Sequence, residues 1–171
     1  MRRILPAFAA LAFAVPASAA LPVGAKAPDF TTTGALAGKP FKLHLADQLK
    51  KGPVVLYFYP KAFTAGCTAE AHAFSEASAD FKKAGAQVIG MSADDYPTLQ
   101  KFSVEGCRSA FPVATASPAV INAYDVKLPL VSMTNRTSYV IASNGRITMV
   151  HSEMSWKDHV GKSLAAVKAL R

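Results

Sequence analysis

One run of residues carries most of the information in this chain of 171 residues: Val54-Val55-Leu56-Tyr57-Phe58-Tyr59-Pro60-Lys61-Ala62-Phe63-Thr64-Ala65-Gly66-Cys67-Thr68-Ala69-Glu70. Its first part, Val54 to Tyr59, is apolar throughout and rich in β-branched and aromatic residues. A strand that is covered on both faces has this composition, because neither face needs polar side chains. Pro60 ends the run, since proline has no backbone N–H to continue a ladder. We therefore predict a central, buried strand.

A cysteine opens the segment that follows. From Cys67 to Ala84 the apolar residues recur at helical spacing, at Phe74, Ala77 and Phe81, which predicts an amphipathic helix. Cys67 falls in the first turn of this helix. There the unpaired backbone N–H groups and the positive end of the helix dipole stabilise a thiolate, the reactive form of cysteine. The pattern therefore indicates a nucleophilic cysteine.

Three residues of this run form the pattern P-x-x-x-T-x-x-C, namely Pro60, Thr64 and Cys67. The pattern resembles the active-site signature of the peroxiredoxins. The resemblance extends to Gly24–Phe30, similar to the family's G-x-x-A-P-D-F entry, and to 135–147, similar to the strand pair that carries its catalytic arginine. Among subfamilies the chain is most similar to the Q-type (bacterioferritin comigratory) peroxiredoxins.

The resemblance implies a thiol-dependent peroxidase that reduces hydrogen peroxide and organic hydroperoxides through a cysteine sulfenic acid. Its catalytic set is Pro60, Thr64, Cys67 and Arg136. Arg136 would supply a fixed charge to sulfur and to the departing oxygen, Thr64 a hydroxyl that positions the peroxide, and Pro60 a shield against water. The implied partner is a thiol reductant, either a thioredoxin-like protein or a small thiol, and no cofactor is implied.

Strand and helix patterns alternate through the chain, and a hairpin and a helix close it. This order predicts the α/β class, with a thioredoxin-like fold in which helices flank a mixed central sheet. A capping box at Ser155 and Asp158 predicts the start of the last helix. The pair Asn144-Gly145 predicts the hairpin turn. The expected strands are 41–45, 54–59, 86–92, 111–115, 137–141 and 146–150, and the expected helices after Cys67–Ala84 are 97–106, 118–124 and one that starts at 155.

The N-terminus is expected to be an export signal. Residues 1–20 contain Arg2-Arg3, an apolar run of about a dozen residues and an A-x-A-like site near Ala19 and Ala20, which is typical of a cleaved signal peptide. The run is too short for a membrane anchor, which needs about 20 apolar residues. Removal leaves one domain, 21–171, with a formal charge of +6 instead of +8. We therefore predict a periplasmic protein.

The remaining positive charge is spread along the chain and has no nucleic-acid-binding motif beside it, so we expect a solvated surface and no nucleic-acid partner. The four histidines, His44, His72, His151 and His159, show no metal-ligand spacing, and no metal site is expected. His72 stands where many Q-type relatives have a second cysteine, and we expect it to point to solvent. The protein is expected to be a monomer or a weak homodimer.

Cys107 is the only other cysteine in the chain, so it is our candidate for the thiol that condenses with a Cys67 sulfenic acid. Ten helical residues from Pro97 would carry Cys107 roughly 15 Å from the sheet edge, so a disulfide would need local unfolding. A one-cysteine mechanism, with an external thiol as reductant, is the alternative.

Two other functions remain open from the residues alone. In an exported protein with two cysteines, a structural Cys67–Cys107 disulfide in a non-catalytic thioredoxin-like module is an ordinary arrangement. A thiol-disulfide oxidoreductase would share the fold, although the chain lacks C-x-x-C. Reactivity of the Cys67 thiol with hydrogen peroxide separates these hypotheses from the peroxidase.

Overall fold

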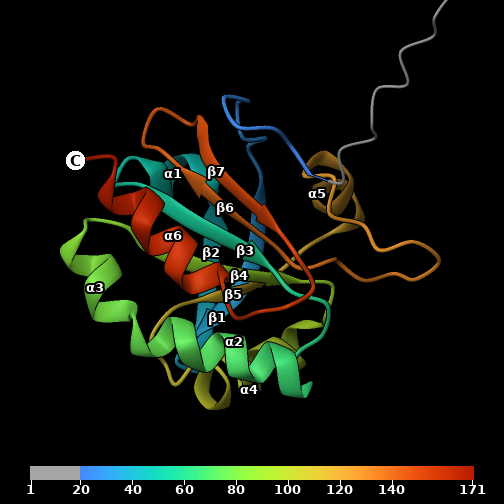
Figure 1. Ribbon diagram of the computed structural model, residues 1–171. Coiled ribbons are helices and arrows are strands. Elements are labelled where there is room, and N and C mark those ends of the chain that lie inside the picture. Colours follow the sequence, from blue (N-terminus) through green and yellow to red (C-terminus); the bar gives the residue numbers. More distant parts are fainter. Residues whose placement is uncertain (1–19) are drawn as a thin grey trace, which may run out of the picture.

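A seven-stranded mixed sheet forms the middle of the protein, in the order β2-β1-β5-β4-β3-β6-β7 (Figure 1). The computed structural model describes residues 20–171. The strands are β1 (Thr31–Leu36), β2 (Lys39–His44), β3 (Val54–Phe58), β4 (Gln87–Ser92), β5 (Val113–Thr115), β6 (Thr137–Ile141) and β7 (Ile147–Ser152). The helices are α1 (Leu45–Leu49), α2 (Ala65–Glu76), α3 (Ser78–Lys83), α4 (Tyr96–Glu105), α5 (Pro118–Ala123) and α6 (His159–Lys168).

Strand β3 is the centre of the sheet, and every one of its residues is buried. It pairs in parallel with β4 and antiparallel with β6, and β4 pairs in parallel with β5. The β3-α2-α3-β4 unit and the β6-β7-α6 unit therefore share one sheet, which confirms the predicted thioredoxin-like architecture. Because β3, β4 and β5 are parallel, their carboxyl ends lie at one edge of the sheet, where ligands of α/β proteins commonly bind.

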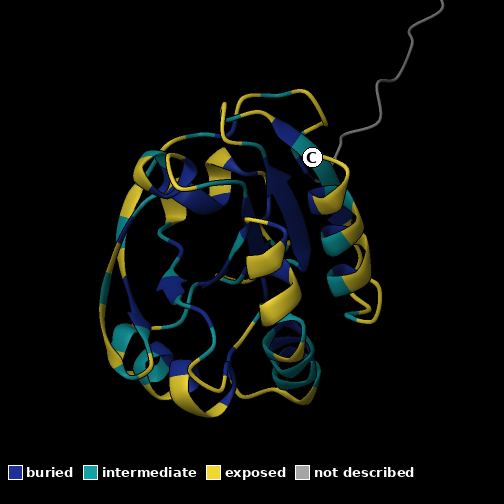
Figure 2. Ribbon diagram, turned by 90° about the vertical axis from the view of Figure 1, so that its left-hand side faces the viewer, coloured by how far each residue is buried: buried dark blue, intermediate teal, exposed yellow. Residues whose placement is uncertain are grey.

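Helices cover both faces of the sheet. On one face, alternate β3 residues such as Val55 and Tyr57 pack with side chains of α2, α3, α4 and α6. On the other face, Val54, Leu56 and Phe58 pack with α1, α5 and the segment that precedes β1. Figure 2 shows buried strands at the centre and exposed residues on the outer sides of the helices. Burial on both faces explains why β3 has no charged side chain.

The structure corrects three details of the sequence prediction. The single helix expected from Cys67 to Ala84 is two helices, because the backbone tightens at Ala77 (φ −82°, ψ −2°) between α2 and α3. The Ser155 capping box does not form: α6 starts at His159, and Ser155 lies in the irregular segment before it. His72, expected to point to solvent, is half-buried on α2.

Strand β1 was missed by the sequence analysis, although it joins the β1–β2 hairpin to β5. The reason is Gly34, which interrupts the strand pattern. A Cβ at this position would lie 2.1 Å from the Val113 carbonyl oxygen. Glycine is therefore needed for the close approach of the two strands, and it weakens the local signal of a strand at the same time.

The expected signal peptide lies outside the described residues, apart from Ala20. Within residues 20–171, none of the helices is long and apolar enough to span a bilayer.

We predict that Gly34→Ala destabilises the protein by about 3 kcal/mol or more, because the new methyl group meets backbone atoms of β5 that cannot move independently of the sheet. Gly161→Ala on α6 is the matched control. Its Cβ would meet nothing within 4 Å, and alanine favours a helix by roughly 0.5–1 kcal/mol. Urea unfolding of both variants checks the difference, and a Gly34→Ala protein as stable as the wild type would contradict it.

Candidate active site

Cys67 lies in the first turn of α2, at the sheet edge where β3 ends. The first intrahelical hydrogen bond at this end runs from the Thr68 N–H to the Thr64 carbonyl, over 2.9 Å. The N–H groups of residues 65–67 therefore have no acceptor within the helix. They point out of the N-terminus of α2, where the helix dipole stabilises a negative charge. The Cys67 side chain is 2% exposed, so its sulfur is nearly shielded from bulk water.

Arg136 is the positive group beside this sulfur. It lies directly before β6, is 5% exposed, and its Nη2 donates to Cys67 Sγ over 3.4 Å. Its Nε donates to the Met154 carbonyl over 2.9 Å, and its Nη1 donates to Glu70 Oε2. Each side of the guanidinium is thus held by a different segment of the chain, which leaves the Nη2 side directed at the sulfur.

Glu70 is the buried carboxyl partner of Arg136. It follows Cys67 by three residues, so the two side chains lie on the same side of α2, and Glu70 is fully buried. Its Oε1 has no hydrogen-bond partner and lies 3.7 Å from His159 Nδ1. Burial raises the pKa of Glu70 from 4.5 to about 8, although Arg136 opposes this shift. Glu70 therefore holds Arg136 at the cost of a strongly desolvated carboxyl group.

The loop between β3 and α2 is fixed by Asp94, which follows β4. Asp94 Oδ2 accepts hydrogen bonds from the Ala62 N–H over 2.7 Å and from Ser92 Oγ over 2.9 Å. Thr134 Oγ1 donates to the Tyr59 carbonyl over 2.7 Å. This hydrogen bond joins the segment that precedes Arg136 to the residue that precedes Pro60. The Arg136 side and the Cys67 loop side of the site are therefore held together.

Thr64 and Pro60 belong to this loop. Thr64 is exposed, and its hydroxyl donates to the Lys61 carbonyl over 2.9 Å. The Thr64 oxygen is therefore directed by the loop and keeps its capacity to accept a hydrogen bond. Pro60 is half-buried and, as a proline, contributes no N–H to the loop.

Cys107 lies just after α4. It is fully buried, and burial raises its pKa, so it is present as the thiol. Both cysteines are free, and both belong to the core layer between the sheet and α2, α4 and α6. The structure thus brings Cys67 and Arg136 into contact and leaves Cys107 in the core.

Sequence reasoning missed four groups of this site: Glu70, Asp94 as a loop support, the Met154 carbonyl, and His159. Glu70 had a signal, because a residue three positions after Cys67 on a helix shares its side. The other three have none, because they come from distant segments and one of them is a backbone carbonyl.

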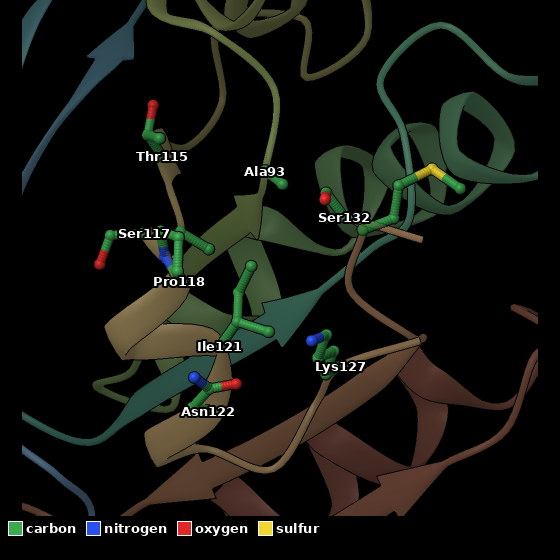
Figure 3. A pocket seen from close by; sticks show the side chains of 10 residues that line it. Ala93, Thr115, Ser117, Pro118, Ile121, Asn122, Lys127 and Ser132 are labelled. Carbon is green, nitrogen blue, oxygen red and sulfur yellow. The ribbon is translucent and has the colours of Figure 1, made fainter. Parts of the chain in front are cut away.

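A cavity of about 430 Å³ opens at the same sheet edge (Figure 3). Its lining includes Ala93, which follows β4, Ser117 and Ile121 near the start of α5, and Ser132 and Met133. Met133 adjoins Thr134, whose hydroxyl contacts the end of β3. The cavity therefore borders the loop that precedes Arg136. Within residues 20–171, no cluster of three or more His, Cys, Asp or Glu side chains is arranged to hold a metal ion.

The arrangement is suited to attack by sulfur on a polar bond. A nearly buried cysteine at a helix N-terminus faces a fixed guanidinium, which stabilises negative charge both on sulfur and on an oxygen that departs beside it. These features also favour a two-electron reaction over a structural role for Cys67, since a structural cysteine needs no buried cation.

Comparison with known proteins agrees with a reactive role for Cys67. The model of the AhpC/TSA family matches residues 23–150. A putative peroxiredoxin of Mycobacterium tuberculosis is 34% identical over 128 residues, which cover 72% of this chain and 82% of the relative. Chloroplastic peroxiredoxin Q of Oryza sativa subsp. japonica is 31% identical over 149 residues, which cover 86% of this chain and 67% of the relative.

Solved structures agree with these relatives. The crystal structure of peroxidoxin BcpB from Mycobacterium tuberculosis matches with a TM-score of 0.78 and 32% identity, over 87% of this chain and 97% of that one. Peroxiredoxin Q from Xanthomonas campestris matches with a TM-score of 0.70 and 28% identity, over 80% of this chain and 89% of that one. On these grounds the chain belongs to the AhpC/TSA family, the peroxiredoxins, and is a thiol-dependent peroxidase.

Proposed function

We propose that Cys67 is the residue that attacks the peroxide. The observation that supports this role is the contact of 3.4 Å between Cys67 Sγ and Arg136 Nη2 in a nearly buried site. The thiolate sulfur attacks one peroxide oxygen, an S–O bond forms as the O–O bond breaks, and the other oxygen leaves with the electron pair. That oxygen takes up a proton and departs as water or an alcohol. Sulfur is oxidised to a sulfenic acid, and the peroxide is reduced.

The other site residues act on this reaction in different ways. Arg136 stabilises the thiolate and the departing oxygen, because its planar fork can face both atoms together. Thr64 positions the peroxide through its hydroxyl oxygen, and Pro60 limits the access of water to the sulfur. Hydrogen peroxide and organic hydroperoxides are the substrates.

Cys107 is proposed as the thiol that regenerates Cys67. The Cys67 sulfenic acid and the Cys107 thiol condense to a disulfide with release of water, and an external thiol then reduces this disulfide. Cys107 is fully buried, so the core around it must open before the two sulfurs meet. The donor is a thioredoxin-like protein or a small thiol, and the enzyme works as a monomer or a weak homodimer.

Export to the periplasm is also part of the proposal. It is supported by the pattern of residues 1–20, and it places the enzyme in an oxidising compartment.

The function is tested with Cys67→Ser. Because a serine hydroxyl is close in size but is not ionised at neutral pH, we expect the variant to fold normally and to lose at least about 99% of the hydrogen peroxide consumption. The measurement is peroxide consumption with a panel of thiol reductants, and circular dichroism is the control for folding. A variant that keeps a tenth of the activity would exclude Cys67 as the nucleophile.

The role of Cys107 is tested by treating the reduced protein with one equivalent of hydrogen peroxide and mapping its thiols by peptide mass. We expect a linked Cys67–Cys107 peptide. The Cys107→Ser variant is the control, and it should stop at the Cys67 sulfenic acid. A stable Cys67 sulfenic acid in the wild-type protein, with Cys107 still open to alkylation after unfolding, would favour the one-cysteine mechanism instead.

Export is tested by mass spectrometry of the protein from the envelope fraction of an expressing cell. We expect a mature chain that begins after Ala19 or Ala20. An intact chain that begins at Met1 or Arg2 would contradict the export proposal and would leave the peroxidase proposal untouched.

A further inference from the structure

We propose that His159 is a positioning residue for the peroxide reaction. It fixes the two groups that orient Arg136, namely the Met154 carbonyl and the Glu70 carboxyl group. The inference rests on the proposed role of Arg136 beside Cys67. His159 is fully buried at the start of α6 and touches neither the sulfur nor the guanidinium through a hydrogen bond of its own. Its contacts reach Arg136 by two separate routes.

The first route runs through the backbone after β7. His159 Nε2 lies 2.9 Å from the Glu153 carbonyl oxygen. The Glu153 N–H donates to the Arg136 carbonyl over 3.2 Å, and the next carbonyl, that of Met154, accepts from Arg136 Nε. The segment 153–158 is otherwise mostly exposed, so the buried imidazole anchors a segment that has few other supports. Loss of the anchor would free the Met154 carbonyl to move.

The second route runs through Glu70. His159 Nδ1 lies 2.8 Å from Ser138 Oγ and 3.7 Å from Glu70 Oε1, the carboxyl oxygen without a hydrogen-bond partner. The other oxygen of Glu70 binds Arg136 Nη1. The imidazole ring therefore packs behind the carboxyl group and keeps it turned towards the guanidinium.

The protonation state of His159 follows from its partners. A carbonyl oxygen only accepts, so Nε2 carries the hydrogen that binds Glu153, and Nδ1 of the neutral ring accepts from the Ser138 hydroxyl. Burial lowers the pKa of His159 to about 4, and the nearby His151, Arg136 and Lys162 add to the effect. A neutral ring with one donor and one acceptor has only one way to satisfy both partners, which makes it a rigid support.

Two substitutions separate the two routes. His159→Gln keeps a donor that can reach the Glu153 carbonyl but has nothing in the place of Nδ1. His159→Asn keeps a polar group near Ser138 and Glu70, but it loses the donor to the Glu153 carbonyl. We expect each variant to lower the second-order rate constant with hydrogen peroxide by about tenfold. Alkylation of Cys67 by iodoacetamide should fall less than the peroxide rate constant, because in that reaction Arg136 stabilises only the thiolate and no departing peroxide oxygen.

The decisive measurement repeats both substitutions in an Arg136→Lys background. Arg136→Lys alone should lower the peroxide rate constant by about 10- to 100-fold, since a point charge cannot replace the fork. If His159 acts through Arg136, its substitution adds less than about twofold to this loss. A full tenfold loss on top of Arg136→Lys would overturn the inference, as would an unchanged rate constant in both single variants.

Controls separate positioning from packing. His151→Gln removes the ring whose centroid lies 4.5 Å from the centroid of the His159 ring. The rate constant of this variant with hydrogen peroxide should stay within about twofold of the wild type. A loss equal to that of the His159 variants would count against the inference. Ser138→Ala removes only the hydroxyl that donates to His159 Nδ1. If a His159 variant does not fold, Ser138→Ala takes its place, and its effect should likewise add less than about twofold to that of Arg136→Lys. A wild-type protein whose Cys67 resists peroxide would overturn the proposed function itself, a result distinct from all of these.

Discussion

The buried contact between Arg136 and Glu70 is the constraint on which the site depends. A guanidinium that is 5% exposed has lost most of its hydration, and it is tolerated only because its donors have fixed acceptors. Those acceptors are the Glu70 carboxyl group and the Cys67 sulfur, both on α2, and the Met154 carbonyl in the segment after β7. The segments that supply them are therefore bound together by electrostatics as well as by the hydrophobic core. An arginine held by fewer partners would turn towards water and away from the sulfur.

The sheet topology explains why these segments meet. Strand β3 has β4 on one side and β6 on the other, so the loop after β3 and the residue before β6 lie at the same edge. The register pairs Phe58 with Thr137, which places Arg136 level with Tyr59 at the point where the active-site loop begins. Helix α6 lies beside α2 (Figure 1), and His159 at the start of α6 lies 3.7 Å from Glu70 Oε1. The geometry of the site is thus a consequence of strand order.

The sequence predicted the parts of this arrangement that have local signals. The uniform hydrophobicity of β3, the helical spacing after Cys67 and the Asn-Gly turn each depend on a few neighbouring residues, and these elements are present. The P-x-x-x-T-x-x-C pattern located Pro60, Thr64 and Cys67 in one loop and turn. Strand β1 was missed because Gly34 serves a contact with β5 that no local pattern records.

The same limit applies to the supports of the site. Glu70 shares a helical turn with Cys67 and was within reach of sequence reasoning, whereas His159 is separated from it by 89 positions in the numbering. The start of α6 was placed too early because Ser155 and Asp158 match a capping box in sequence. In the structure this segment is irregular and mostly exposed, and the Met154 carbonyl accepts a hydrogen bond from Arg136 Nε. A tertiary contact has overridden a local preference.

The start of α2 reconciles two requirements of the proposed reaction. Thr64 is the N-cap residue, yet its hydroxyl donates to Lys61 and does not cap the helix, whereas Asp95 caps α4 through the Thr98 N–H. A missing cap leaves the first N–H groups of α2 free to face an anion at Cys67, and it also lowers the cost of opening this turn by about 1 kcal/mol. Cys107 is fully buried beyond the other end of α4, so the cap at Asp95 does not bear on it and its own segment must open as well. If a disulfide forms, the uncapped first turn of α2 lowers the cost of the part of the opening that frees Cys67, so the feature that favours the thiolate also favours its release from the fold.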